Sequence, residues 1–252
     1  MQDKTMKLAE HLAELRRRVL FCLAVFIVTL IGGMFAADYL LALIRSVPPA
    51  SDIAWHAFSL WDGIRIYIQI GFVLSLVITL PFTMYQLWLF VKPGLHEHER
   101  QATLRSIPLA ALLFVTGLGF GYFVVFRMAF GFTRLLNEKM GLVETYGASQ
   151  YFTFMFNILL PVSLMFELPV VVIFLTKIRI LNPIFMRRMR RYAYLLLVIL
   201  GTMMTPPDLV SDLLLIGPMI GLYELSLLLA QSVYRKQQLR DQQRELEWNR
   251  GT

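Results

Sequence analysis

Six apolar segments, separated by polar stretches, constrain this chain more than any other feature of its sequence. The hydrocarbon core of a bilayer is ~30 Å thick and holds no water, so a segment that crosses it must satisfy its backbone amides within a helix or a closed barrel. Long continuous apolar runs do not show the alternation of barrel strands. The sequence therefore predicts an all-α polytopic membrane protein with six transmembrane helices, at residues 19–37, 63–91, 107–130, 151–176, 192–205 and 213–233.

The composition supports a membrane location. The chain is 57% hydrophobic and only 16% charged, whereas soluble domains carry about 25% charged residues. In so apolar a chain, the net charge of +7 indicates basic loops beside anionic lipid, and we expect no nucleic-acid partner. The single cysteine, Cys22, excludes a disulfide framework within the chain.

The distribution of Lys and Arg predicts the orientation. If the N-terminus is cytoplasmic, 19 of the 24 basic residues fall on the inner side, as the positive-inside rule requires. Both termini, including the polar tail 235–252, are then cytoplasmic. The first segment could instead be a cleaved signal peptide, but its apolar run is longer than usual and no small-residue cleavage site follows it.

The lengths of the segments predict the shape of a single membrane domain spanning residues 1–252. Segment 63–91 is too long to cross a bilayer upright, and Pro81 could kink it. Segment 192–205 would form only about 21 Å of helix at ~1.5 Å per residue, so we expect the membrane to be thinner there. The outer loops, 38–62 and 127–150, are long enough to pack together as an extracytoplasmic cap on a kinked, concave bundle.

Two charged stretches lie beside the membrane segments. In the N-terminal stretch, Glu14 and Arg18 are four residues apart, a spacing that favours an ion pair on one helix. In the second stretch, residues 96–100 read His-Glu-His-Glu-Arg. A metal site is not expected there, because two histidines two residues apart diverge on a helix and lack further metal ligands. The stretch is therefore either a solvated turn or an acidic docking patch beside Phe90.

Glu167 is the most unusual residue of the membrane segments. An ionised side chain near the bilayer centre costs roughly 2.5–3.5 kcal/mol on insertion scales, so we expect Glu167 to face the bundle interior. A structural hydrogen bond, a proton relay and a partner contact all remain open for it. Glu224 is a second such acid, in the sixth segment. The sequence shows no hydrolase, metalloprotease or nucleotide-binding motif, so we expect neither catalysis, nor a metal site, nor a cofactor.

Four ordered motifs resemble the TatC family, the multi-spanning receptor subunit of the twin-arginine protein translocase. They are the stretch from His11 to Arg16, the stretch from Tyr85 to Arg100, Phe166 to Pro169, and Thr205 to Asp208. The resemblance covers essentially the whole chain. It implies an integral protein of the bacterial cytoplasmic membrane that binds signal peptides with paired arginines on folded cargo, for export driven by the proton-motive force.

The resemblance also implies a site and partners. Glu14 and Glu99 would receive the two arginines, in a patch shaped by Arg16, Phe90, Pro93, Leu95 and Arg100. Glu167, Thr205, Asp208 and Asp212 would contribute intramembrane polar or partner contacts. The partners implied are single-span TatA-type subunits, with or without TatB, and further copies of this chain. The chain departs from the family pattern at Asp212 and in the stretch 59–62.

Magnitudes limit what the two acids can do. Exposed ion pairs contribute roughly 0–1 kcal/mol each, whereas micromolar binding needs about −8 kcal/mol. We therefore expect the apolar stretch of the signal peptide to supply most of the affinity. Two other classes of protein remain. A secondary transporter would show two repeats with broken helices, and none is visible, while a plain membrane scaffold would tolerate the loss of Glu99 and Glu167.

Overall fold

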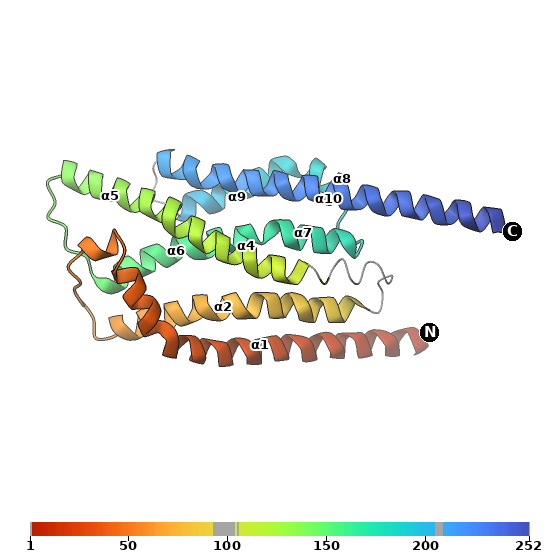
Figure 1. Cartoon of the computed structure of the whole chain (residues 1–252), viewed down its shortest axis with the longest axis horizontal. Coiled ribbons are helices and arrows are strands. Elements are labelled where there is room, and N and C mark those ends of the chain that lie inside the picture. Colours follow the sequence, from red (N-terminus) through yellow and green to blue (C-terminus); the bar gives the residue numbers. More distant parts are fainter. Residues whose placement is uncertain (1, 93–103, 105, 205–208, 252) are drawn as a thin grey trace.

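The computed structural model describes residues 2–92, 104, 106–204 and 209–251. The described chain contains no strand, only a single β-bridge between His56 and Gly147, which confirms the all-α class. Its long helices run side by side along one axis (Figure 1). The elements are α1 (Gln2–Arg45), η1 (Ala50–Asp52), α2 (Asp62–Val91), α4 (Ser106–Phe120), the π-helical η3 (Gly121–Phe126), α5 (Arg127–Lys139), α6 (Ala148–Phe166), α7 (Leu168–Lys177), α8 (Pro183–Arg188), α9 (Arg190–Met204) and α10 (Leu209–Gly251).

Within the described residues, five helical stretches are long and apolar enough to cross a membrane. They are Leu12–Arg45, Asp62–Val91, Ile107–Lys139, Ala148–Lys177 and Leu215–Gln243. The remaining apolar segment, the fifth along the chain at 192–205, forms α9, which has 15 residues and is only about 22 Å long at ~1.5 Å per residue. The protein is thus an all-α polytopic membrane protein in which one apolar segment forms a much shorter helix than the five long helical stretches.

Several helices extend beyond their apolar segments. Residues 38–45, which the sequence assigned to an outer loop, are the end of α1, because Leu40, Leu41 and Ile44 pack against the core. The expected loop at 127–150 is wrong over its first half: α5 continues the third segment to Lys139. Its inward side chain Phe130 packs against the rings of Tyr146 and Tyr151, and this burial offsets the polar character of the segment.

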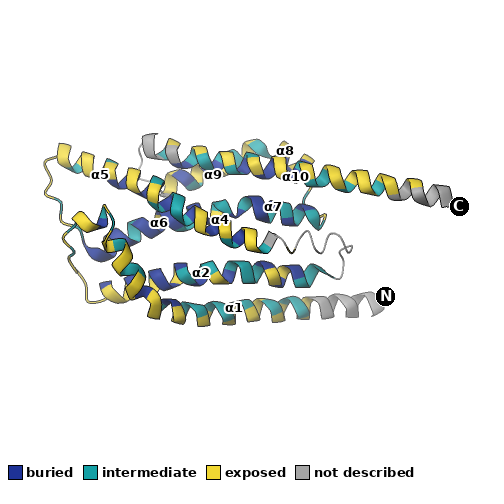
Figure 2. Cartoon of the chain, in the orientation of Figure 1, coloured by how far each residue is buried: buried dark blue, intermediate teal, exposed yellow. Residues whose placement is uncertain are grey.

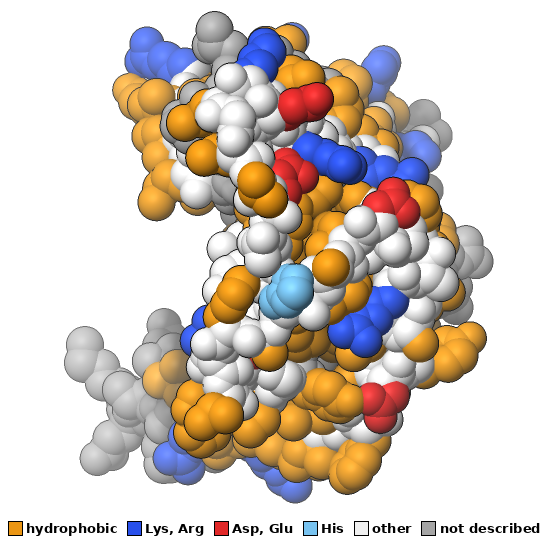
Figure 3. Space-filling model, turned by 90° about the vertical axis from the view of Figure 1, so that its left-hand side faces the viewer, with side chains coloured by type: hydrophobic (Ala, Val, Ile, Leu, Met, Phe, Trp, Pro, Cys, Tyr) orange, Lys and Arg blue, Asp and Glu red, His pale blue; other side chains and the backbone are white. Residues whose placement is uncertain are grey.

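The two ends of the bundle differ. Both chain termini lie at one end, here called the terminal end, where the long α10 projects (Figure 1). The other end, here called the loop end, carries η1 and the connections 46–61 and 140–147. Viewed from the loop end, the molecule is hollowed on one side (Figure 3).

The loop-end connections pack on each other as the expected cap. The amide of Ala148 donates to the carbonyl of His56 at 2.7 Å, and Arg127 Nη2 donates to the carbonyl of Pro48 at 3.0 Å. The indole of Trp55 lies against the ring of Phe152, with centroids 5.4 Å apart. These contacts tie the connection 46–61 to the starts of α5 and α6, so these helices enter the bundle with a defined spacing.

The core lies along the inner faces of α2, α6 and α10, whereas most of α1 is exposed on its outer side (Figure 2). In a membrane such exposed apolar side chains face lipid. Among the helices, α1 packs mainly on α2. The two approach closely at Gly33, where an added Cβ would lie 2.8 Å from the carbonyl oxygen of Gly71. This close crossing sets how α1 and α2 meet at the terminal end.

Candidate functional site

A groove lies between α1 and α2 near their terminal ends. Its volume is about 570 Å³. Charged and amide side chains form part of its lining, and apolar side chains of α1 form the rest. The lining residues are Glu14, Arg17, Arg18, Leu20, Phe21, Ala24 and Gln86. The groove therefore offers a carboxylate, two guanidinium groups and an apolar wall to a ligand.

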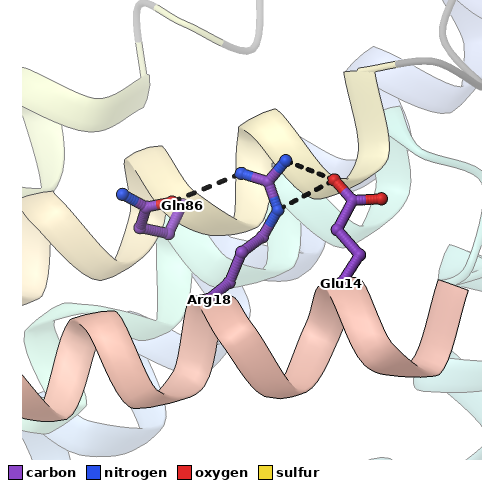
Figure 4. Close-up of polar contacts among 3 residues, drawn as sticks. All are labelled: Glu14, Arg18 and Gln86. Carbon is purple, nitrogen blue, oxygen red and sulfur yellow. Dashed lines mark hydrogen bonds and ion pairs between the residues drawn. The ribbon is translucent and has the colours of Figure 1, made fainter. Parts of the chain in front are cut away.

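Arg18 joins the two helices across this groove (Figure 4). Its Nε donates to Glu14 Oε1 at 3.1 Å, and its Nη2 donates to the same oxygen. Its Nη1 donates to Gln86 Oε1 of α2 at 3.3 Å. The predicted pairing of Glu14 with Arg18 is thus confirmed. The third member of the cluster, Gln86, lies 68 positions after Arg18 in the chain.

Local packing explains why these three side chains meet. Four-residue spacing places Glu14 and Arg18 on one face of α1. Gln86 lies on the inward face of α2 and is only 8% exposed. One turn from the cluster, the rings of Phe21 and Phe82 meet edge to face at 5.4 Å and hold α1 against α2. A buried amide needs a hydrogen-bond partner, and Arg18 supplies it.

The two charged partners differ in exposure. The side chain of Glu14 is 42% exposed and that of Arg18 is 21% exposed. The second carboxylate oxygen of Glu14, Oε2, points away from Arg18 (Figure 4), and no described residue donates to it. An accessible carboxylate oxygen, held in place by its neighbour, can accept a cationic donor from outside the protein.

The other residues expected at this site are placed as follows. Arg16 is exposed on α1 and does not line the groove. Phe90 lies one turn beyond Gln86, near the end of α2, and is partly buried. Pro93, Leu95, Glu99 and Arg100 lie outside the described residues. The chain that carries them connects α2 to α4, both of which meet it at the terminal end (Figure 1).

Sequence reasoning missed Gln86 as a site residue. Its signal was present, because an amide in the apolar run of α2 needs a partner. The same end of α2 carries an aromatic surface. The rings of Tyr85 and Trp88 stack at 5.8 Å, and the ammonium of Lys92 lies 5.2 Å from the Trp88 ring centre.

Glu167 lies at the junction of α6 and α7. Pro169 has no amide hydrogen and its ring clashes with the preceding turn, so the helix breaks there. The Glu167 residue is 6% exposed, and its Oε1 has no hydrogen-bond partner among the described residues. The acid therefore faces the protein interior. One turn before Glu167, α4 packs closely on α6, since a Cβ on Gly117 of α4 would lie 2.7 Å from Ser163 Cα.

The other polar residues singled out in the sequence lie in different places. Asp212 lies in the first turn of α10, whereas Thr205 and Asp208 lie outside the described residues. Glu224 is paired within the protein: it accepts a hydrogen bond from Arg190 Nη2 at 2.7 Å and another from the hydroxyl of Tyr194. This pairing fastens the start of α9 to α10. Within the described part of the chain, no three His, Cys, Asp or Glu side chains could hold a metal ion.

Comparisons with known proteins agree with this architecture. Residues 10–218 match the model of the family described as TatC, Sec-independent protein translocase protein. A Sec-independent protein translocase protein TatC of Halalkalibacterium halodurans is 41% identical over 248 residues, which cover 98% of each chain. The TatCy protein of Bacillus subtilis is 37% identical over 94% of each chain, and TatC of Escherichia coli K12 is 34% identical over 88% of this chain and 87% of its own.

Solved structures give the same result. A crystal structure described as the twin arginine translocase receptor TatC superposes with a TM-score of 0.71 and 27% identity, covering 88% of this chain and 99% of its own. A second crystal structure of that receptor, in DDM, gives a TM-score of 0.76 at 25% identity, over 87% of this chain and 99% of the other. The sequence match covers 98% of this chain and the shared fold covers 88% of it. This chain, an integral membrane component of protein transport, therefore belongs to the TatC family of Sec-independent protein translocase proteins.

Proposed function

We propose that this chain is the receptor subunit of a twin-arginine translocase and that it binds twin-arginine signal peptides of folded proteins at its terminal end. The observation that carries the proposal is the carboxylate of Glu14, held by Arg18 in the groove between α1 and α2 with one oxygen turned away from its partner. A guanidinium group matches a carboxylate through a planar fork, which an ammonium group cannot imitate.

We further propose that the terminal end is cytoplasmic and that the membrane is the bacterial cytoplasmic membrane. The excess of Lys and Arg on this side supports the assignment through the positive-inside rule. Glu99 would then lie on the same side of the membrane as Glu14, since the ends of α2 and α4 that its segment connects are at the terminal end. Two acids on two segments suit two adjacent arginines, with Arg16, Phe90, Pro93, Leu95 and Arg100 around them.

The apolar wall of the groove supports a route for the rest of the signal peptide. Exposed ion pairs of roughly 0–1 kcal/mol each do not account for micromolar binding. Leu20, Phe21 and Ala24 continue the groove from the charged cluster towards the membrane interior. Burying about 200 Å² of apolar peptide surface there would contribute roughly 5 kcal/mol at about 25 cal/mol per Å². The acids would select the ligand, and the apolar contacts would hold it.

The partners we propose are single-span TatA-type subunits, with or without a separate TatB, and further copies of this chain. The short α9 supports a docking role, because large side chains such as Leu195, Leu196 and Ile199 are exposed on it. Glu167, Thr205, Asp208 and Asp212 are proposed as polar contacts for such partners within the membrane. Export would use the proton-motive force.

The test is site-directed crosslinking of a twin-arginine peptide to the full chain in membranes. We expect crosslinks from positions beside Glu14 and Glu99, and their loss with a twin-lysine peptide. Glu99→Ala should abolish export of a twin-arginine reporter while the protein still inserts into the membrane. Normal export by this variant would remove Glu99 from the site, and equal crosslinking of both peptides would refute the receptor function.

A further inference from the structure

We propose that Arg18 is an internal competitor for the carboxylate of Glu14, and that Gln86 retains Arg18 when a ligand arginine takes its place. The inference rests on the proposed function and assigns it two further specificity-determining residues. It concerns how the groove rejects a cation that is not an arginine. Three observations support it: the donors that occupy Glu14, the net charge of the groove, and the position of Gln86.

The first observation is that Glu14 is already occupied by an arginine. Two N–H groups of Arg18, on Nε and Nη2, converge on Glu14 Oε1. A ligand guanidinium would present the same planar set of donors to the same carboxylate. Full engagement of Glu14 by a ligand therefore replaces one arginine with another, and the exchange conserves the number and kind of hydrogen bonds.

The second observation is the charge balance. The ionised groups that line the groove are Glu14, Arg17 and Arg18, so one carboxylate faces two guanidinium groups. A further cation entering this groove meets net repulsion, unless Arg18 leaves the carboxylate. A lysine side chain brings a strongly hydrated point charge without a planar fork. A lysine that takes Oε1 of Glu14 would have to break the two bonds of Arg18 to that oxygen and could not rebuild both in the same geometry.

The third observation explains where Arg18 goes. Its Nη1 already donates to Gln86 Oε1 at 3.3 Å, and Gln86 belongs to α2, a different helix from Glu14 (Figure 4). When Nε and Nη2 release Glu14, this third bond can remain. A mostly buried guanidinium without any partner would be costly, so Gln86 lowers the cost of opening the site. Specificity is a difference between two affinities. Displacing Arg18 costs more binding free energy for a lysine ligand than for an arginine ligand, so the exchange favours arginine.

The experiment measures binding of two fluorescent peptides, twin-arginine and twin-lysine, to the full chain in lipid nanodiscs. Arg18→Gln should tighten the twin-arginine peptide about 2- to 5-fold, the range of one exposed ion pair. It should tighten the twin-lysine peptide by more, so that the ratio of the two affinities falls. Arg18→Lys, which keeps the charge but not the fork, should give an intermediate ratio.

Arg17→Gln is the matched control. Arg17 lines the same groove and carries the same charge, but it forms no ion pair with any described residue. Its loss should strengthen both peptides by the same small factor and leave their ratio unchanged. Gln86→Leu should weaken twin-arginine binding in the presence of Arg18 and have no such effect in the Arg18→Gln background.

The outcomes separate this inference from the function on which it rests. If twin-arginine binding is present in the unaltered chain and lost in Glu14→Gln, the receptor function stands. Weaker twin-arginine binding in Arg18→Gln, or an unchanged ratio of affinities, would then overturn the competitor role alone. If the unaltered chain binds neither peptide, or Glu14→Gln binds both as before, the proposed site is wrong and the inference is overturned with it.

Discussion

The close crossing of α1 and α2 gives the sharpest test of how this fold is held together. Gly33→Ala would place a Cβ 2.8 Å from the carbonyl oxygen of Gly71 and 3.1 Å from its Cα. These are backbone atoms of a long helix and cannot rotate away, so the two helices must separate. Overpacking of this kind costs typically about 1–3 kcal/mol. For a chain of this size each kcal/mol lowers the melting temperature by about 2–4 °C, so we expect a decrease of about 2–12 °C.

The neighbouring Gly32 provides a matched control. A Cβ on Gly32 meets no atom within 4 Å, and alanine favours a helix over glycine by about 1 kcal/mol. Gly32→Ala should therefore leave the melting temperature unchanged or raise it slightly. Both variants carry the same chemical change one residue apart, so membrane insertion and helix propensity are matched.

The assay is thermal unfolding of the purified protein in detergent, followed by the fraction that stays monodisperse. A cysteine pair across α1 and α2 near the groove, introduced in a background lacking Cys22, reports whether the helices remain together. We expect slower disulfide formation in Gly33→Ala than in Gly32→Ala. If the two variants melt at the same temperature and crosslink at the same rate, the close crossing does not hold α1 in place and the reasoning fails.

Three further predictions concern other parts of the bundle. Asp62→Ala removes the carboxylate that accepts hydrogen bonds from the backbone amides of Phe58 and Ser59, at 2.8 and 3.0 Å. The loss should cost about 1 kcal/mol and expose the connection before α2 to protease, while unchanged protease resistance would contradict it. Glu224→Gln weakens the bonds to Arg190 and Tyr194, and because the pair is partly exposed we expect a loss of about 1 kcal/mol, larger than that of Tyr194→Phe in the same melting assay. Cysteine scanning along the 15-residue α9 should find that fewer residues are protected from a polar thiol reagent between its two ends than along α2. Labelling that places both ends of α9 at the same membrane depth as the ends of α2 would exclude local thinning of the membrane.

Much of the fold could be predicted because its signals are local. A long apolar run in a bilayer has only one backbone solution, so the helices at 63–91 and 192–205 follow from composition. The pair of Glu14 with Arg18 follows from helix geometry alone. The interruption near Glu167 follows from the covalent structure of Pro169. These features need no knowledge of any other part of the chain.

The ends of the helices were harder to predict because packing decides them. Residues 127–139 are polar enough to form a loop, yet they continue as α5 since Phe130 finds buried aromatic neighbours. Glu224 looked like an isolated membrane acid until α9 brought Arg190 against it. In both cases the deciding partner is at least 16 residues away in the chain, so no local pattern contains the information.

The sequence by itself therefore determined the class of the protein, the number of its apolar segments, the separate charged motifs and the one ion pair that a single helix can form. Only the tertiary structure decided that Gln86 meets Arg18 across the groove, because that contact depends on the depth and register at which α1 lies on α2. The register in turn follows from the backbone contact at Gly33 and Gly71. Periodicity along one helix determines on which face of that helix a residue lies. The packing of two helices determines which residue of the second helix it contacts.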